Sequence, residues 1–421
     1  MDIFSLATQV KPYVVECRRH FHRHPELSDR EENTIAFVKG ELTKMGIEHV
    51  EVPYGGVLGF IEGPRPGKSV VLRADMDALP IQESPVNGGG FPKACVSEVP
   101  GVGHLCGHDA HTAVLLGSAK VLSEHREEIE GRVILFFQRG EEYGYGMDFM
   151  MRYLQDNKIH VDGAWGMHVN TGARVGQIGL CSGGFYSGAL SFALTVTSPN
   201  EEPPVDCAVA IVNALNVLRM REVLPIKSVT LTVTGFQTVE NKCKLIGTCR
   251  YHDQKVDGRN MHDAIERSAR ELCRAYGCTL TGTVGKPTIG VMNDPTCCEI
   301  ARAAVGAAIG ADHLYTPAPA MGHEDFSALA AFYPSMFAAL GVTDPDRGLT
   351  AGIHNEHFEA NEDAFPYGVA ATVSYALGFL KHKEDIPFDG ITTDYDTFLV
   401  EVEGRKPPKA PAGGDTNDPN V

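Results

Sequence analysis

The chain has 421 residues, of which 43% are hydrophobic and 22% are charged, and this composition is that of an ordinary globular protein with more than one domain. Its 37 basic and 54 acidic side chains give a formal net charge of −17, which argues against nucleic acid and anionic membranes as partners. No stretch approaches the roughly 18 uninterrupted apolar residues of a membrane span, so we expect none.

The N-terminal segment has no charged-then-apolar export signal, and its apolar spacing instead predicts an amphipathic helix over residues 3–22. The 11 cysteines are odd in number and scattered along the chain. Without an export signal, we expect them to be reduced thiols in the cytoplasm.

Helices and short apolar strands alternate over the first 185 residues. After the helix at 3–22 the expected elements are a helix at 32–45, strands at 47–52, 57–62, 69–73 and 131–138, a helix that begins near Asp109, and a strand at 164–167. Continuously apolar strands separated by helices predict an α/β fold with a mostly parallel sheet covered on both faces.

The pattern changes near residue 186. Residues 189–197 alternate between apolar and polar, as in a half-solvated antiparallel strand. A helix at 204–221, strands at 228–236 and 242–251, a helix at 258–276 and a strand at 279–284 are expected to follow. The order β-α-β-β-α-β is a ferredoxin-like pattern that is complete in itself.

We therefore predict a discontinuous metal-binding catalytic domain of residues 1–185 and 291–385. A smaller lid and dimerisation domain, residues 186–290, interrupts it. The C-terminal extension, residues 386–421, is rich in proline, glycine and charge towards its end, so we expect it to be partly disordered.

Three groups of candidate functional residues each follow one of the expected strands, and a fourth group precedes a helix. Open parallel sheets bind ligands at these strand ends. These residues are Asp75 and Asp77, Glu141 and Glu142, His168, and the run from Cys106 to Thr112. Thiolate, imidazole and carboxylate together suit a divalent ion such as zinc, with manganese, cobalt or nickel as further candidates. The sequence therefore predicts a metal centre at this rim of the sheet.

Spacing divides the roles among these residues. Cys106 and His108 are two residues apart, so both side chains can face the same way in an extended loop, whereas His111 lies on the helix and suits the same metal less well. The adjacent Glu141 and Glu142 should point in opposite directions in an extended chain. One of them can then bind metal while the other carries a proton.

Other interpretations stay open for each residue taken alone. A single histidine or cysteine is more often structural than a ligand, two glutamates after a strand are usually a solvated loop, and Asp75 with Arg73 can form a plain salt bridge. Cys106 can also be a nucleophile with His108 as its base. We favour the metal centre because the features occur together, and because residues two apart rarely pair as nucleophile and base.

Several blocks of sequence carry a resemblance to a known family. They cover most of residues 18–170 and 320–360, and they are RRHFHRHPELSDREENTIAF, VVLRADMDALPIQE, HLCGHDAHTAVLLGSAKVL, GRVILFFQRGEE, AWGMH, MGHEDFSAL and GIHNEHF. The chain resembles the aminoacylase and carboxypeptidase family of dinuclear metallopeptidases. Within that family it is most similar to the amidohydrolases that include hippurate hydrolase and the auxin-conjugate hydrolases.

The resemblance implies two divalent metal ions and a set of named residues around them. The implied ligands are Cys106 as the bridge, His108, Glu142, His168 and His354, with His357 as a nearby rival of His354. Glu141 would be the general base, and Asp77 would orient a ligand imidazole. The family hydrolyses N-acyl amino acids, short peptides and related amides with a metal-activated water, and the lid's edge strand leads us to expect a homodimer.

The lid departs from the family pattern. The family carries Gly-Gly-His-Ala after the first lid strand, and that histidine stabilises the tetrahedral intermediate, whereas residues 197–204 here contain no histidine. Residues 235–241 replace an Asn-x-Ile-Pro turn, which leaves Gln237 or Asn241 as substitutes, and Gln138-Arg139-Gly140 replaces Gln-Pro-Ala. Losing one such donor typically costs about 10²–10³ in rate.

Two hypotheses follow from this balance. The leading one is an active metal-dependent amidohydrolase with Glu141 as its general base. The alternative is a metal-binding member of the family with lost or altered catalysis, which acts as a ligand-binding or regulatory protein.

Overall fold

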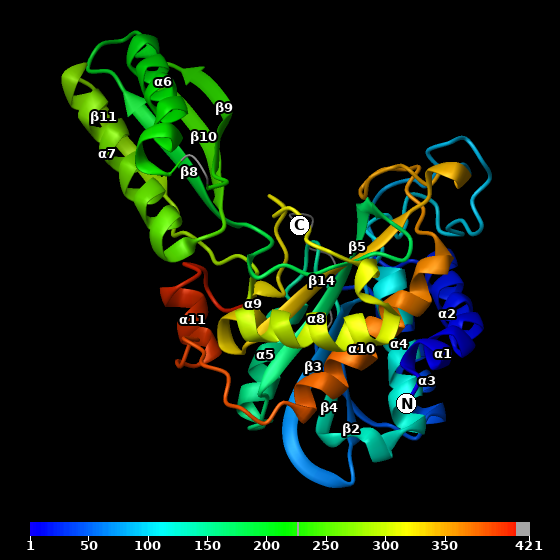
Figure 1. Cartoon of the computed structure of the whole chain (residues 1–421). Coiled ribbons are helices and arrows are strands. Elements are labelled where there is room, and N and C mark those ends of the chain that lie inside the picture. Colours follow the sequence, from blue (N-terminus) through cyan, green and yellow to red (C-terminus); the bar gives the residue numbers. More distant parts are fainter. Residues whose placement is uncertain (225–226, 410–421) are drawn as a thin grey trace.

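The computed structural model describes residues 1–224 and 227–409 and contains two large sheets (Figure 1). The larger sheet has eight strands in the order β1-β2-β4-β3-β5-β14-β6-β13. Its strands are β1 (Glu48–Val52), β2 (Gly56–Glu62), β3 (Arg65–Asp75), β4 (Glu130–Gln138), β5 (Gly163–Arg174), β6 (Ile178–Gly179), β13 (Leu314–Tyr315) and β14 (Ser335–Thr343). The central strands β4, β3, β5 and β14 run parallel, so the predicted α/β class with a mostly parallel sheet is confirmed.

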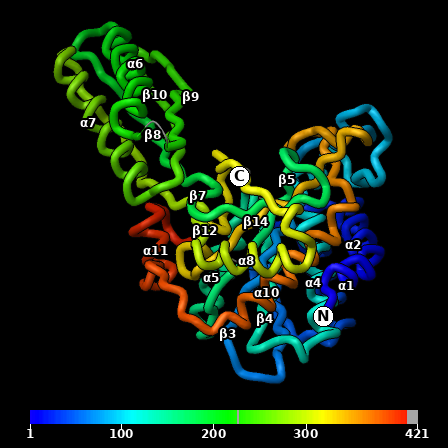
Figure 2. Tube along the Cα trace, viewed as in Figure 1, coloured from blue at the N-terminus to red at the C-terminus, as the bar shows by residue number. Residues whose placement is uncertain are grey.

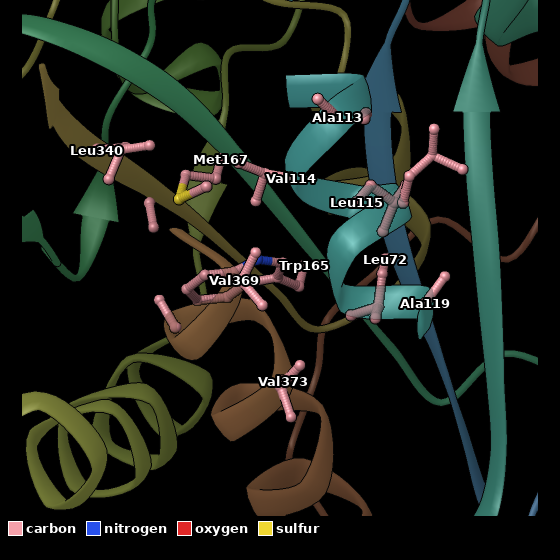
Figure 3. Packing of buried hydrophobic residues seen from close by; sticks show 14 of the residues in the cluster. Leu72, Ala113, Val114, Leu115, Ala119, Trp165, Met167, Leu340, Val369 and Val373 are labelled. Atoms are coloured by element: carbon pink, nitrogen blue, oxygen red, sulfur yellow. The ribbon is translucent and has the colours of Figure 1, made fainter. Parts of the chain in front are cut away.

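Helices cover both faces of this sheet, which explains why its central strands carry apolar residues without alternation. One face packs against α1 (Ile3–Gln9), α2 (Lys11–Arg23), α3 (Glu32–Lys44), α4 (His108–Glu124), α8 (Pro295–Ile309) and α10 (Phe365–Lys381). The other face packs against α5 (Gly146–Asp156), α9 (Ser327–Phe332) and α11 (Tyr395–Glu401). Figure 3 shows the first face, where Leu72 and Trp165 of the sheet lie against α4 and α10.

The single helix expected over residues 3–22 is wrong, because the chain forms α1 and α2 with a break at Val10. Pro12 stands in the first turn of α2. Proline has no backbone N–H, so it is tolerated in a first turn but cannot continue a preceding helix.

The second sheet belongs to the inserted segment and has the order β11-β8-β10-β9. Its elements in chain order are β8 (Gly188–Thr197), α6 (Val205–Glu222), β9 (Thr230–Val239), β10 (Lys242–Tyr251), α7 (Arg259–Ala275) and β11 (Thr279–Val284). This is the ferredoxin-like arrangement predicted from the sequence, with α6 and α7 packed together on the sheet. The tube in Figure 2 shows the insertion projecting away from the larger sheet.

The insertion is joined to the rest of the chain by two adjacent connections, which pair as the short strands β7 (Gly183–Gly184) and β12 (Met292–Asn293). Short helical turns complete the fold at Arg126–Glu128, Gln254–Gly258, Ala311–His313, Pro345–Arg347 and Glu362–Ala364. Within the described residues, no helix combines the length and the hydropathy of a bilayer span.

The C-terminal extension packs against α5 over its described part, and the expected disorder of its end falls on residues 410–421, which lie outside the described residues. Tyr395 of α11 is buried and donates a hydrogen bond from its hydroxyl to Asp148 of α5 at 2.8 Å. Arg405 donates to the same carboxylate at 2.7 Å. One buried aspartate therefore holds the extension at two points.

Replacing Asp148 with Asn should lower the free energy of unfolding by about 2 kcal/mol, because it weakens two bonds to a charged acceptor. Urea unfolding followed by circular dichroism measures this change. The matched control is Asp396→Asn, since Asp396 pairs with Arg152 but its side chain is 55% exposed, and we expect a change within about 0.5 kcal/mol. Equal losses in the two variants would contradict the anchoring role.

Candidate metal centre

The five predicted ligands converge at the carboxyl ends of the central strands. Cys106 Sγ lies 3.4 Å from His168 Nε2 and 3.2 Å from His354 Nε2. His354 Nε2 lies 3.1 Å from Glu142 Oε1, which is in turn 4.0 Å from His108 Nε2. Side chains that are far apart in the sequence therefore surround one small space.

A glycine makes the Cys-Gly-His placement possible. Gly107 has φ 96° and caps the N-terminus of α4, whose first residue is His108. A Cβ at Gly107 would lie 2.5 Å from a methyl carbon of Val169, so a larger residue would be strained in conformation and would also collide. The chain can thus turn sharply between Cys106 and His108 while both side chains face the cluster.

His168 lies within β5, although we expected it to follow a strand that ends at residue 167. The strand continues to Arg174 because β14 pairs with it in parallel well past His168. The side chain still reaches Cys106, because His168 lies on the part of β5 that is buried on both faces and its Nε2 is 3.4 Å from Sγ.

His354 rather than His357 faces the other candidate ligands. His354 has φ 59°, and its backbone N–H donates to the carbonyl of Leu105 at 2.7 Å, which fixes this left-handed conformation next to Cys106. The Nδ1 atom of His357 lies 3.0 Å from the carbonyl oxygen of Val86 instead. The two histidines thus occupy different environments three residues apart.

Asp77 organises the ligands from behind. Its carboxylate accepts hydrogen bonds from His108 Nδ1 at 3.1 Å and from Ser28 Oγ at 2.6 Å. It also accepts from the backbone N–H groups of Glu141 and Glu142 at 3.1 and 3.0 Å. Burial alone would raise the pKa of Asp77, but the bonds from His108 and Ser28 outweigh burial and hold this pKa below its ordinary value.

The hydrogen bond to Asp77 sets the tautomer of His108. With the proton on Nδ1, the lone pair of Nε2 points into the cluster, and Nε2 is buried without a hydrogen-bond partner among the described residues. Glu142 Oε1 is buried and equally without a hydrogen bond there. Buried atoms with unshared lone pairs, one thiol and further imidazoles form a donor set that fits divalent metal ions.

His111 lies outside this donor set, as its position on the helix predicted. Its Nε2 accepts from the backbone N–H of Val169 at 2.9 Å, so its Nδ1 carries the proton and donates to Asp75 at 2.7 Å. Asp75 also pairs with Arg73 at 2.7 Å, which is the salt bridge considered from the sequence. Both ring nitrogens of His111 are therefore occupied.

We expected the side chains of Glu141 and Glu142 to point in opposite directions, and next to His108 this is wrong. Both carboxylates lie 4.0 Å from His108 Nε2. The chain is not extended there. Gly140, at φ 62°, starts a turn in which both glutamate N–H groups point to Asp77. Only beyond His108 do the two side chains separate, with Glu142 towards His354 and Glu141 towards a further acidic pair.

That acidic pair, Glu324 and Asp325, was missed in the sequence. Arg73 Nη2 lies 3.0 Å from Glu324 and 2.8 Å from Asp325, so one buried cation partly neutralises them. Burial and the charges of Glu324 and Asp325 raise the pKa of Glu141 well above its ordinary value. The available signal was the His-Glu-Asp run at 323–325, but neither spacing nor a predicted strand end tied it to the other acids.

The replaced lid segments lie at the far end of the insertion. Residue Lys242 pairs with Thr197 at one end of the lid sheet, and Tyr251 pairs with Gly188 at the other. The Tyr251 end is the one joined to the larger sheet, where Arg250 donates to the carbonyl of Met321. Asn241 donates to Ser198 at the opposite end, and Gln237 pairs with Lys244 near that end, so neither side chain approaches the ligand cluster of its own chain.

Comparisons with known proteins agree with the fold and identify the family. IAA-amino acid hydrolase ILR1-like 2 from Arabidopsis thaliana is 32% identical over 398 residues, which are 90% of this chain and 88% of that protein. Thermostable carboxypeptidase 2 from Saccharolobus solfataricus is 28% identical over 390 residues, covering 88% and 96% of the two chains. The Bacillus subtilis YXEP protein, described as a dinuclear metal binding peptidase from the M20 family, superposes with a TM-score of 0.77 at 26% identity, covering 89% of this chain and 99% of that one.

The resemblance seen in the sequence is confirmed by these relatives and by a match to a whole family. The match is to Peptidase family M20/M25/M40 and spans residues 71–378, from the second half of β3 to the last turns of α10. Since these residues make up most of the chain and include every candidate ligand, the protein belongs to the peptidase M20/M25/M40 family of hydrolases.

Proposed function

We propose that the protein is a metal-dependent amidohydrolase that cleaves the amide bond of N-acyl amino acids, short peptides or related amides. The observation that carries this proposal is the convergence of one thiol, three imidazoles and one carboxylate beside a second carboxylate, Glu141. The names of an amino acid conjugate hydrolase and a carboxypeptidase among the relatives support an amide or peptide substrate.

The donor set suits two divalent ions, which would be zinc, manganese, cobalt or nickel. Cys106, His108, Glu142, His168 and His354 would hold them. Ions in such a site polarise a substrate carbonyl and lower the pKa of water towards about 7. The cluster thus contains the metal ligands and the free carboxylate that the proposed reaction needs, while the lid histidine of the family pattern is absent.

Glu141 is the residue to which we assign proton transfer. It is not required as a ligand, its carboxylate reaches the cluster at His108, and burial together with its acidic neighbours raises its pKa. A carboxyl group with an elevated pKa can accept a proton from the attacking water and then release it to the leaving amine. Asp77 supports this step indirectly, because it fixes both His108 and the turn that carries Glu141.

A substrate panel with metal analysis tests the proposal. Metal-loaded protein should release free amino acid from at least one N-acyl amino acid or dipeptide, chelation should abolish the release, and added metal should restore it. Absence of turnover across the whole panel, with both ions measured in the protein, would reject the proposed activity. Ligand binding without turnover is the result that the non-catalytic alternative requires, and we do not favour it because Glu141 is retained beside the cluster.

Thiol alkylation separates this reading from a cysteine nucleophile. Cys106 is 6% exposed and contacts two imidazoles, and burial raises the pKa of its thiol well above the ordinary value. A thiol in this environment reacts slowly with iodoacetamide, and coordination by bound metal should slow its alkylation further, so chelation should speed the reaction. Equal alkylation with and without metal would favour the nucleophile.

We also propose that residues 1–185 and 291–385 form the catalytic domain and that residues 186–290 act as lid and dimerisation domain. The support is the edge position of β9, where Phe236 is 44% exposed, together with Met220 of α6, which is 73% exposed. Sedimentation should give the mass of two chains. The eleven thiols, all without a disulfide, support a reducing compartment such as the cytoplasm.

A further inference from the structure

The aromatic ring of Tyr186 forms part of the wall of the candidate metal centre. Tyr186 lies between β7 and β8, where the chain passes from the larger sheet into the lid. Its ring centroid is 6.3 Å from that of His168. The residue therefore combines a position at the base of the lid with a side chain at the ligand cluster.

Packing and backbone bonds hold this ring in place. It meets Phe185 edge-on at 5.0 Å and Phe337 of β14 edge-on at 5.7 Å. The carbonyl of Tyr186 accepts from Val291 N at 3.1 Å, and the next residue donates its N–H to Gly322 at 3.0 Å. Three segments of the chain thus fix one phenol, so little conformational freedom remains to be lost on binding.

The hydroxyl of Tyr186 is a free donor. Among the described residues it makes no hydrogen bond, and burial, with a smaller contribution from the charge of Glu324, raises its pKa well above the ordinary value. A phenol ordinarily titrates near pH 10, so at neutral pH it keeps its hydrogen even without such a shift. A hydrogen-bond donor left unshared within a polar site is available to a ligand.

Two other donor side chains near the cluster are already in use. Arg73 is shared by Asp75, Glu324 and Asp325. Both nitrogens of His111 are occupied, and the lid segments that replace the family's histidine and asparagine lie at the distal end of the insertion. Tyr186 is therefore a side-chain donor that remains available beside the cluster for a hydrogen bond to a substrate.

We infer that the Tyr186 hydroxyl donates a hydrogen bond to the substrate's amide oxygen as the carbonyl carbon becomes tetrahedral, and so takes over the task of the missing lid histidine. The inference rests on the proposed amidohydrolase function. The oxygen gains negative charge in that step, so the same donor binds it more strongly than it binds the planar amide. Because Tyr186 belongs to the same chain as the ligands, this stabilisation does not depend on the reach of the lid's distal end.

The test is Tyr186→Phe, which removes only the hydroxyl and keeps the packing of the ring. We expect kcat to fall by about 10²-fold, as for the loss of one oxyanion donor, with KM changed by less than about threefold. Calorimetry supplies a second readout: a phosphinic analogue of the tetrahedral state should bind about 10²-fold more weakly to the variant. A reduced-amide analogue, which has no such oxygen, should bind equally to both proteins, and metal content should be unchanged.

Tyr315→Phe is the matched control. Tyr315 is another phenol of the larger domain whose hydroxyl has no partner among the described residues, but it packs on Gly179 at the β13 edge of the sheet. Its loss should leave kcat and both analogue affinities unchanged.

Unchanged kcat and unchanged phosphinic affinity in Tyr186→Phe would overturn the inference, and so would loss of metal from that variant, because it would reveal a structural role. If the wild-type protein hydrolysed no amide in the panel, the proposed function would fail by itself. The phosphinic titration would then still decide whether Tyr186 binds a tetrahedral oxyanion.

Discussion

Replacing Glu141 with Gln should lower kcat by about 10²–10⁴-fold and leave both metal ions bound, because the amide cannot accept a proton from water and the ligand set is intact. The free carboxylate lies 4.0 Å from His108 and turns towards Glu324 and Asp325, away from His354. Single-turnover kinetics on the best substrate of the panel, with metal content measured by mass spectrometry, give both quantities.

The adjacent glutamate provides the control for that experiment. Glu142→Gln is the same chemical change one residue along the chain, but Glu142 faces His354 and Cys106. It should therefore reduce metal content as well as rate. If the two variants lost metal to the same extent, or if Glu141→Gln kept the wild-type rate, the division of roles between the two residues would be wrong.

Replacing Asp77 with Asn should weaken metal binding by about 10–100-fold, which is the usual cost of removing a carboxylate that orients a ligand imidazole. Four hydrogen bonds end on Asp77, from His108, Ser28, Glu141 and Glu142. An amide has one oxygen to accept them and presents an N–H₂ group where the second oxygen stood. Competition against a fluorescent zinc chelator measures the apparent Kd.

Asp75→Asn separates orientation of a ligand from general stability. Asp75 also holds an imidazole by its Nδ1 atom, but that imidazole is His111, whose other nitrogen is bonded to the backbone. The variant leaves Arg73 with weaker partners in the core, so it should unfold more easily. Its metal affinity should fall less than that of Asp77→Asn, because Asp75 lies 3.9 Å from His108 Nε2 and makes no hydrogen bond to that ring. Equal metal affinity in wild type and Asp77→Asn would contradict the role given to Asp77.

Periodicity predicted most of the fold because the elements are long and their burial is simple. The strands at 69–73 and 131–138 are buried on both faces, and β8 alternates as expected for a sheet with one covered face. The prediction missed the break between α1 and α2, because the helical spacing of apolar residues continues across it. Only the chemistry of Pro12 reveals that helix end.

The candidate ligands could be predicted because each lies at or near a strand end or a helix start, or in a block typical of the family. Glu324, Asp325 and Tyr186 could not, since their proximity to the site depends on how a loop and a lid connection fold back over the sheet. The turn at Glu141 depends on Gly140 and on the carboxylate of Asp77. That carboxylate accepts hydrogen bonds from the N–H groups of Glu141 and Glu142, which lie 64 and 65 residues later in the sequence. Local pattern carries no information about such pairings.

The pairing of β7 with β12 has a consequence for how this chain can vary. The insertion is tethered by one narrow neck of two short strands, and its outermost loops are separated from the ligand cluster by the whole length of β8. Shortening those loops therefore leaves the ligand cluster, which lies near the β7–β12 connection, unchanged. Substitutions can therefore change the contacts made by the distal loops of the insertion, while the residues near the β7–β12 pair are selected separately.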